Sequence, residues 1–374
     1  MKISILLPYK ENFSPIYPGA VSLFINETTK ISRYKSNIII YGNTNYKKRF
    51  KLNYVNINLQ KKLLQSQSKK YVDEFIKIEK KDKSDLIEIH NRPYYLRFLI
   101  NSLNKRVYSL YFHNDPLTMT GSRSIDDRKF LLKNCYKIIF NSNWSKKRFL
   151  EGMHNKFVNS EKLIVIHQSA KRNKINITNK KKWITFVGKL NRSKGYDIFA
   201  KTIVRVLDRF PDWKALIVGD EQRDKINVNH KNIIKYGFIE HQKVLEIYKK
   251  TSIAAVCSRW DEPFGRTSLE AASNGCAVII SNRGGLPETI TNGIILRNNY
   301  AQSLFRSSNG YDLNDMQNHI CKFQHQPNTT GTVTYGFYFR SEGNNTTYFN
   351  ISGGDSSTWG WSASQCLELR EVRP

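Results

Sequence analysis

The apolar positions of this chain gather in short runs, separated by polar stretches of helix or loop length. In the first half the runs cover residues 3–7, 37–41, 85–89, 107–112, 137–140 and 163–166. Short runs that are apolar on both faces, with connectors long enough for crossovers, are typical of parallel strands in an α/β sheet. We therefore predict such a sheet, with any ligand at the carboxyl ends of its strands.

A second series of runs follows a polar, lysine-rich passage without periodicity. These runs cover residues 183–187, 215–218, 233–237, 253–257 and 277–280, and helix-like stretches at 196–210 and 243–250 lie between them. The alternation predicts a second doubly wound α/β domain. The predicted organisation is a first domain at 1–167, a linker at 168–182, a second domain at 183–299 and a different segment at 300–374.

The segment 300–374 has another composition, rich in Asn, Thr, Ser, Gly and aromatic residues. Its five basic residues are balanced by six acidic ones, so residues 1–299 carry all of the basic excess. Runs at 330–339 and 348–351 predict short antiparallel strands and turns. This tail is either a small β appendage or a segment foreign to the rest of the chain.

Length and composition fit a folded protein of two domains, with 374 residues of which 40% are hydrophobic. No apolar run reaches the roughly 18 to 20 residues that cross a bilayer, and the run at 3–7 is too short for a signal peptide. The five cysteines are scattered, without the spacing of a zinc site. We expect a cytoplasmic protein with reduced thiols.

The formal net charge of +29 favours an anionic partner, namely nucleic acid, an acidic membrane surface or a phosphorylated substrate. The alternative is compositional drift without selection for binding. Residues 47–83 hold twelve basic residues against four acidic ones, interleaved with apolar positions, which predicts a basic amphipathic helix. That helix either docks peripherally on the inner face of an anionic membrane or is a solvated face over an ordinary core.

The most informative stretch runs from Trp260 to Gly275 and contains two glutamates, Glu262 and Glu270. The first lies on a tight loop and the second on the following helix, for which Thr267 or Ser268 is a suitable N-cap. A helix N-terminus offers free N–H groups to a phosphate. The layout therefore fits a nucleoside diphosphate sugar, with hydroxyls at both ends and phosphates between. The alternative is a capped surface helix with two solvated glutamates.

Other residues at predicted strand ends extend this interpretation. Gly188, Lys189 and Lys194 follow the first strand of the second domain, and two cations there would neutralise a departing diphosphate. Gly19, before the first predicted helix, could bring backbone close to a phosphate or form a simple turn. His90 also ends a strand, and for it we favour a structural role.

The segment 262–265 (Glu-Pro-Phe-Gly) with Glu270 resembles the E-x7-E motif of retaining glycosyltransferases of the GT-B fold, especially glycosyltransferase family 4. The segments 138–146, 183–195 and 281–289 also resemble that family, and the likeness covers about residues 1–299. It implies two Rossmann-like domains and sugar transfer from a nucleoside diphosphate sugar to a hydroxyl of a surface glycan or glycolipid, such as a lipopolysaccharide or exopolysaccharide. It implies no metal and no cofactor beyond this co-substrate.

The resemblance also implies roles for single residues. Glu262 would hold the donor sugar and Glu270 the ribose, while Lys189, where the family usually has Arg, and Lys194 would hold the diphosphate. The donor sugar would lie near His113, because family members commonly carry a histidine at that strand end. The remaining donor-binding candidates are Gly19, Gly188, Phe264, Gly265, Thr267 and Ser268.

Two rival functions remain. One is a GT-B nucleotide-sugar epimerase, which would bind the same donor without an acceptor. The other is an inactive basic protein that binds nucleic acid or an anionic membrane. We expect no nucleic-acid partner, because the chain lacks an RNA-binding signature and its aromatic residues are not clustered with the basic stretch.

Overall fold

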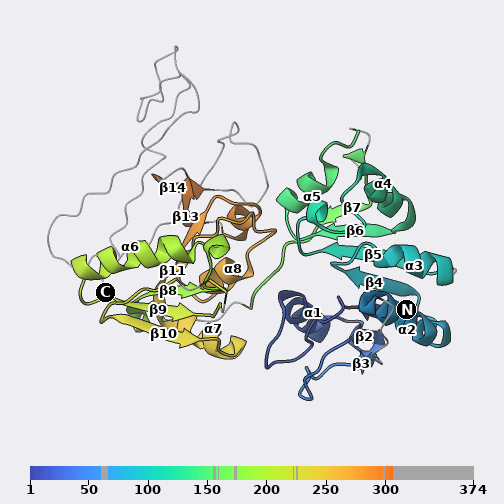
Figure 1. Cartoon of the computed structure of the whole chain (residues 1–374), viewed down its shortest axis with the longest axis horizontal. Helices are drawn as coiled ribbons and strands as arrows, with labels where there is room; N and C mark the ends of the chain where they lie inside the picture. The colour runs from blue at the N-terminus through green and yellow to red at the C-terminus, as the bar shows by residue number, and fades with distance from the viewer. Residues whose placement is uncertain are drawn as a thin grey trace, which may run out of the picture. The chain divides into compact units, whose positions relative to one another are not determined.

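The computed structural model describes residues 1–305, apart from 60–65, 104, 155, 156, 159, 172–174, 222, 225, 291, 298 and 299 (Figure 1). Within this part of the chain, helices and strands alternate to form two sheets of seven strands each. The strands predicted for the tail, together with Cys321 and Cys366, lie outside the described residues.

The first sheet has the order β3-β2-β1-β4-β5-β6-β7, and all of its neighbouring strands are parallel. Its strands are β1 (Ile3–Leu6), β2 (Ile38–Gly42), β3 (Tyr54–Asn56), β4 (Leu86–His90), β5 (Val107–Phe112), β6 (Lys137–Phe140) and β7 (Leu163–Val165). The helices between them are α1 (Ala20–Ile31), α2 (Gln67–Asp82), α3 (Tyr95–Ser102), α4 (Ile125–Asn134) and α5 (Asn143–Leu150).

The second sheet repeats this topology in the order β10-β9-β8-β11-β12-β13-β14, with only β14 antiparallel to its neighbour. Its strands are β8 (Lys181–Val187), β9 (Lys214–Val218), β10 (Ile233–Gly237), β11 (Thr251–Val256), β12 (Ala277–Ser281), β13 (Asn292–Arg297) and β14 (Tyr300–Phe305). Its helices are α6 (Tyr196–Arg209), α7 (His241–Lys250) and α8 (Arg266–Ser273). The sheet thus occupies residues 181 to 305, and the predicted domain limits stay a prediction.

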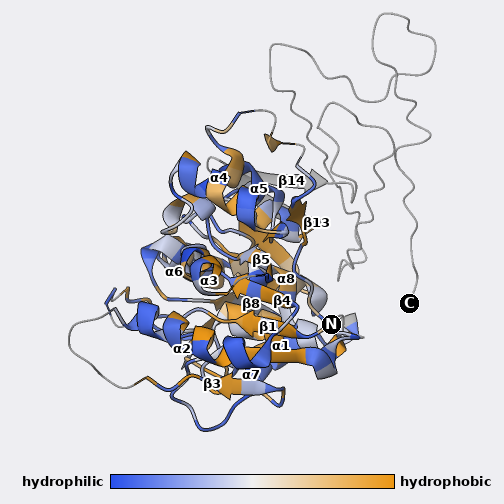
Figure 2. Ribbon diagram, turned by 90° about the vertical axis from the view of Figure 1, so that its right-hand side faces the viewer, coloured by the Kyte–Doolittle hydropathy of each residue, from blue (hydrophilic) through white to orange (hydrophobic). Residues whose placement is uncertain are grey.

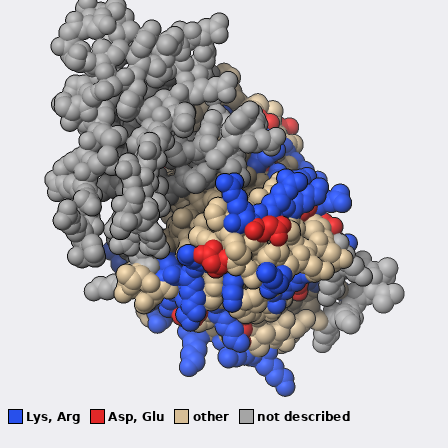
Figure 3. Space-filling model, turned by 90° about the vertical axis from the view of Figure 1, so that its left-hand side faces the viewer, with Lys and Arg blue, Asp and Glu red and all other residues tan. Residues whose placement is uncertain are grey.

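Buried apolar clusters lie on the central strands of each sheet, which explains why those strands are largely apolar (Figure 2). The basic stretch 47–83 contributes α2, which buries Tyr71, Val72, Phe75 and Ile76 and exposes lysines. On the face shown in Figure 3, which is the side of the second sheet, Lys and Arg side chains are more prominent than Asp and Glu side chains. No helix in the described part of the chain is long and apolar enough to span a membrane.

Candidate functional site

The predicted site residues of the second sheet lie where its strand order reverses. The chain leaves β8 toward β9 on one side, whereas β11 pairs with β8 on the other. Since these strands are parallel, the loops after β8 and β11 leave the same edge. Such a switch point is the usual ligand-binding position in an open α/β sheet.

The turn after β8 packs directly against the loop after β11. Gly195 has a φ of +69°, and a Cβ placed on it would lie 1.8 Å from the carbonyl oxygen of Cys257. A side-chain hydrogen bond within the turn stabilises it, since Asn191 Oδ1 accepts from the N–H of Lys194 at 3.1 Å. The backbone therefore fixes Lys194 beside the loop that carries Glu262.

Lys194 and Glu262 form an ion pair through Glu262 Oε1. The same oxygen accepts a hydrogen bond of 3.0 Å from the Ser258 hydroxyl. Among the described residues nothing donates to Glu262 Oε2. One oxygen of this carboxylate is therefore held by the protein and the other is available to a ligand.

Lys189 differs from Lys194 in its surroundings. Its side chain is exposed and makes no ion pair or hydrogen bond within the described residues. Gly188 precedes it with a φ of +154°, and its carbonyl oxygen would lie 1.8 Å from a Cβ on Gly219. Because the backbones of Gly188 and Gly219 approach so closely, Lys189 lies at the end of β8, where its ammonium group has no ion pair within the described residues.

A pair of glycines holds the backbone of the loop 262–265. The N–H of Gly285 donates to the Glu262 carbonyl oxygen at 2.6 Å. A Cβ on Gly284, whose φ is +58°, would lie 2.2 Å from that oxygen, so no larger residue fits without a shift. Phe264 is buried and its ring stacks on the His167 ring at 5.9 Å.

The N-cap of α8 is Gly265, so the predicted cap at Thr267 or Ser268 is wrong. Gly265 has a φ of +112°, a conformation that favours glycine, and the Ser268 hydroxyl donates to its carbonyl oxygen instead of accepting from the helix. The backbone N–H groups of Arg266, Thr267 and Ser268 have no acceptor among the described residues. Ser268 is fully buried, whereas Arg266 and Thr267 are half-buried, so the N–H groups of these two are the ones available to an anion at this helix end.

Glu270 is buried. Its Oε1 forms a hydrogen bond of 2.8 Å with His241 Nε2 and lies 2.6 Å from Arg266 Nε. The Arg266 contact is an ion pair, since Arg266 Nε makes no hydrogen bond within the described residues. Burial alone would raise the pKa of Glu270, but the His241 hydrogen bond and the Arg266 charge lower it below its usual value. Arg266 also reaches Glu27 of α1 at 2.6 Å. As in Glu262, Oε2 has no partner among the described residues.

His113 lies at the end of β5, partly buried, with both ring nitrogens in contact with protein. Its Nε2 lies 3.0 Å from His90 Nδ1, and the Gln168 side-chain amide lies 3.4 Å from its Nδ1. Burial and the neighbouring His90 hold the pKa of His113 well below its usual range, so the ring is neutral at pH 7. His90 Nε2 makes no hydrogen bond to any described residue and lies 3.6 Å from Glu88 Oε2.

Gly19 lies beside a carboxylate of the chain itself. Glu11 Oε1 accepts hydrogen bonds of 3.0 Å from the N–H and the hydroxyl of Ser22, in the first turn of α1. A Cβ on Gly19 would lie 2.0 Å from the same oxygen. The close backbone approach predicted at Gly19 is thus made to Glu11 in this structure.

The structure brings Lys194 and Glu262 into contact and joins their loop to α8. No hydrogen bond, ion pair or ring contact links His113 or Gly19 to either residue within the described chain. Sequence reasoning missed the supporting residues His241 and Ser258, because no local pattern marks a side chain that acts from another element. Within the described residues, no group of three or more His, Cys, Asp or Glu side chains could hold a metal ion.

The fold is known from solved structures. The crystal structure of Anabaena Alr3699/HepE in complex with UDP-glucose matches with a TM-score of 0.61 at 17% identity, covering 79% of this chain and 85% of that chain. At this identity the likeness concerns the fold alone. With the two Rossmann-like sheets described above, it confirms the predicted GT-B fold.

The match to a family model concerns mainly the second sheet. Residues 167–309 match the family model of glycosyl transferases group 1. An uncharacterized 41.2 kDa protein in the cps region of Klebsiella pneumoniae is 25% identical over 245 residues, 59% of this chain and 66% of that protein. The lipopolysaccharide core biosynthesis mannosyltransferase LpsB of Rhizobium meliloti (strain 1021) is 27% identical over 123 residues, 30% of this chain and 35% of that protein. The chain spans between about a third and two thirds of the length of the first curated relatives it matches.

Proposed function

We propose that this chain is a retaining glycosyltransferase of family 4 that moves a sugar from a nucleoside diphosphate sugar to a hydroxyl of a surface glycan or glycolipid. The observation that carries the proposal is the pair Glu262 and Glu270 on either side of an open helix N-terminus. Each carboxylate is held by cationic or hydroxyl partners through Oε1 and leaves Oε2 without a partner among the described residues. Both glutamates lie within the stretch that matches the group 1 family model.

Each part of such a donor has a suitable partner. Oε2 of Glu262 accepts from a hydroxyl of the sugar, and Oε2 of Glu270 accepts from a ribose hydroxyl. The free N–H groups at the start of α8 and the unpaired Lys189 bind the diphosphate. Lys194 pairs with Oε1 of Glu262 and leaves Oε2 to accept from the sugar.

The proposed reaction needs stabilisation of the leaving group. The bond between the anomeric carbon and the phosphate oxygen breaks, a bond from that carbon to the acceptor oxygen forms on the same face, and the acceptor proton passes to the departing phosphate. Negative charge grows on the diphosphate as the bond breaks, so cations and N–H groups already in place act on the transition state. In this proposal they replace a metal.

The comparisons support a choice of donor and acceptor to test. The Anabaena protein was crystallised with UDP-glucose, which makes UDP sugars the first donors to test. The name of the Rhizobium relative includes lipopolysaccharide core biosynthesis, which supports a glycolipid or surface glycan as acceptor. The lysine-rich α2 gives such an enzyme a surface for peripheral contact with an anionic membrane.

The test measures thermal stability against UDP, GDP, ADP and their sugars. One nucleotide at a hundredfold excess over its Kd should stabilise the intact protein by about 2.7 kcal/mol. Glu270→Gln should lose that response, whereas Glu246→Gln, an exposed carboxylate on α7 with 53% of its side chain accessible, should keep it.

No response from the folded protein to any nucleotide would refute the proposal. Consumption of the donor without an acceptor would favour the epimerase. Steeply salt-dependent binding to nucleic acid or anionic vesicles, without donor binding, would favour the inactive basic binder.

A further inference from the structure

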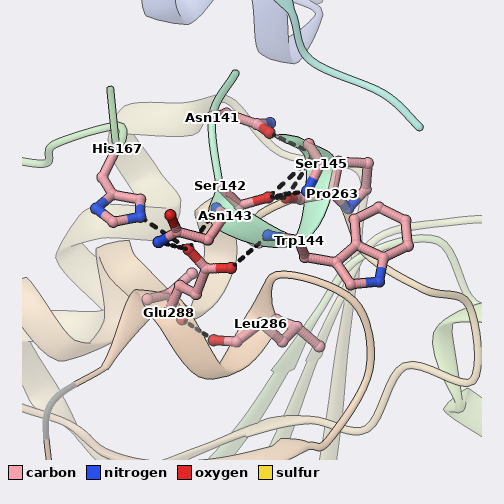
Figure 4. A network of polar contacts seen from close by, with 10 residues as sticks. Asn141, Ser142, Asn143, Trp144, Ser145, His167, Pro263, Leu286 and Glu288 are labelled. Carbon is pink, nitrogen blue, oxygen red and sulfur yellow. Dashed lines mark hydrogen bonds and ion pairs between the residues drawn. The ribbon is translucent and has the colours of Figure 1, made fainter. Parts of the chain in front are cut away.

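Glu288 connects the two sheets through its carboxylate. It lies on the short 3₁₀ helix η6 (Leu286–Thr289) of the second sheet, yet all of its side-chain partners lie between β6 and β8 (Figure 4). Oε2 accepts from the N–H of Asn143 at 2.7 Å and from His167 Nε2 at 2.9 Å. Oε1 accepts from the N–H of Trp144 at 2.9 Å.

The surroundings of Glu288 suit a charged carboxylate. Its side chain is only 6% exposed, and burial alone would raise its pKa. The hydrogen bond from His167 and the two backbone N–H groups lower the pKa below its usual value. Because those N–H groups belong to the first turn of α5, the positive end of that helix adds to the effect. Glu288 is therefore ionised at neutral pH.

The same contacts control the loop that carries Glu262. Glu288 follows the glycine pair, whose Gly285 N–H holds the carbonyl oxygen of Glu262. From the other side, the hydroxyl of Ser142, the residue before Asn143, donates to the carbonyl oxygen of Pro263 at 2.5 Å. His167, bound by Glu288, stacks on Phe264. The loop 262–264 is thus held next to the first turn of α5 in two ways. Ser142 bonds to it directly, and Glu288 binds the N–H groups of α5 from the segment whose Gly285 bonds to Glu262.

We infer that Glu288 is a positioning residue that sets the loop 262–264, and with it the Glu262 carboxylate, for the sugar part of the donor. This inference rests on the proposed function. Glu288 acts through the loop and does not touch the donor. Within the described residues Glu288 contacts neither of the diphosphate partners, Lys189 and the start of α8, and η6 is joined to α8 by the hydroxyls of Thr289 and Ser268 at 2.7 Å, a contact that Glu288 does not make. Loss of Glu288 should therefore weaken recognition of the sugar and leave recognition of the nucleotide.

The purely structural alternative is a buried carboxylate that only stabilises the fold. Glu79 provides the matched control, because its side chain is fully buried and accepts hydrogen bonds from Ser4 at 2.8 Å and from Ser84 in the first sheet. Glu79→Gln and Glu288→Gln both remove a buried charge with little change of volume, so both should lower the melting temperature. A stabilising role alone would not change which ligand the protein prefers.

The experiment measures by calorimetry the Kd for the free nucleotide and for its sugar, using the nucleotide that stabilises the intact protein. The readout is the ratio of the two constants. For Glu288→Gln we expect the preference for the nucleotide sugar to fall about tenfold, the order expected from lost charge-assisted hydrogen bonds, with the Kd of the free nucleotide unchanged. Ser142→Ala should shift the ratio in the same direction, and it carries the test if Glu288→Gln does not fold. The control Glu79→Gln should keep the ratio of the intact protein.

The outcomes separate this inference from the proposed function. Binding by the intact protein with the same ratio in Glu288→Gln and Ser142→Ala overturns the positioning role and leaves the proposed function standing. An equal loss of nucleotide and nucleotide-sugar affinity also overturns it, since Glu288 would then act on the whole fold. If the intact protein binds neither ligand, both the proposed function and the positioning role fail.

Discussion

Arg266 offers a sharp test of the electrostatics around Glu270. Its side chain is 12% exposed and lies 2.6 Å from each of two carboxylates, Glu270 on the same helix and Glu27 on α1. Arg266→Met keeps most of the apolar stem and removes the charge. Glu270, with a side chain only 6% exposed, would keep His241 as its single close partner.

The expected cost follows from the burial of this pair. Removing one partner of a buried ion pair costs about 3 to 5 kcal/mol, because the remaining charge is left without compensation. Lys182→Met is the control, since Lys182 and Asp212 form an ion pair with both side chains more than half exposed. An exposed pair of this kind contributes at most about 1 kcal/mol.

The pH dependence gives a second readout. In the intact protein the pKa of Glu270 is lowered, so its stabilising contribution is complete above the usual carboxyl range and is lost as the pH falls through the lowered pKa. Without Arg266 one of the causes that lower the pKa is lost, so the pKa of Glu270 rises relative to that in the intact protein. The folded variant then takes up a proton at a higher pH than the intact protein does, and its deficit in stability should shrink as the pH falls.

Urea denaturation at pH 7 and at pH 5 measures both effects. Equal slopes for the variant and the intact protein would show that the comparison concerns stability alone. The reasoning would be refuted by a loss below about 1 kcal/mol at pH 7, similar to that of Lys182→Met, or by a loss that does not depend on pH.

Two further predictions concern the turn after β8. Gly195→Ala should lower stability by more than Gly237→Ala in urea denaturation. Both glycines have positive φ, but a Cβ on Gly195 would lie 1.8 Å from the Cys257 carbonyl oxygen, whereas nothing lies within 4 Å of a Cβ on Gly237. Equal losses would show that the turn can move away from the β11 loop. Lys189→Ala should weaken nucleotide binding without a change in melting temperature. Lys194→Ala should lower the melting temperature, because it removes the cation that pairs with the Glu262 carboxylate. An unchanged nucleotide Kd in Lys189→Ala would exclude this lysine from the diphosphate site.

Most strands could be predicted from the sequence because a sheet covered on both faces requires apolar side chains at nearly every position. The run at 107–112 matches β5 in full, and the other predicted runs begin and end within about two residues of the observed strands. The prediction missed β3, because it has only three residues and all of them are half-buried, so no apolar run marks it. It also missed β13 and β14, which continue the second sheet on the far side of β12.

The site was predictable only where neighbouring residues on the chain carry it. The loop 262–265 and the helix after it follow from proline, glycine and a short helical pattern. The partners of the two glutamates come from other elements, His241 from α7 and Lys194 from the turn after β8, so only tertiary packing shows them. The family resemblance assigned Lys194 to the diphosphate, which stays a prediction, and the structure adds an ion pair between Lys194 and Glu262 that no local pattern indicates.

The carboxylate of Glu11, next to the start of α1, affects how many diphosphates one protein molecule is expected to bind. Two helices, α1 and α8, follow a glycine at a loop of the kind that can receive a phosphate, one in each half of the chain. Glu11 accepts hydrogen bonds from the first turn of α1 and would oppose a second anion there, whereas in the described part of the chain no carboxylate accepts from the N–H groups that begin α8. The first turns of α1 and α8 therefore differ in charge, although the two sheets share one topology. We expect one molecule of protein to bind one diphosphate.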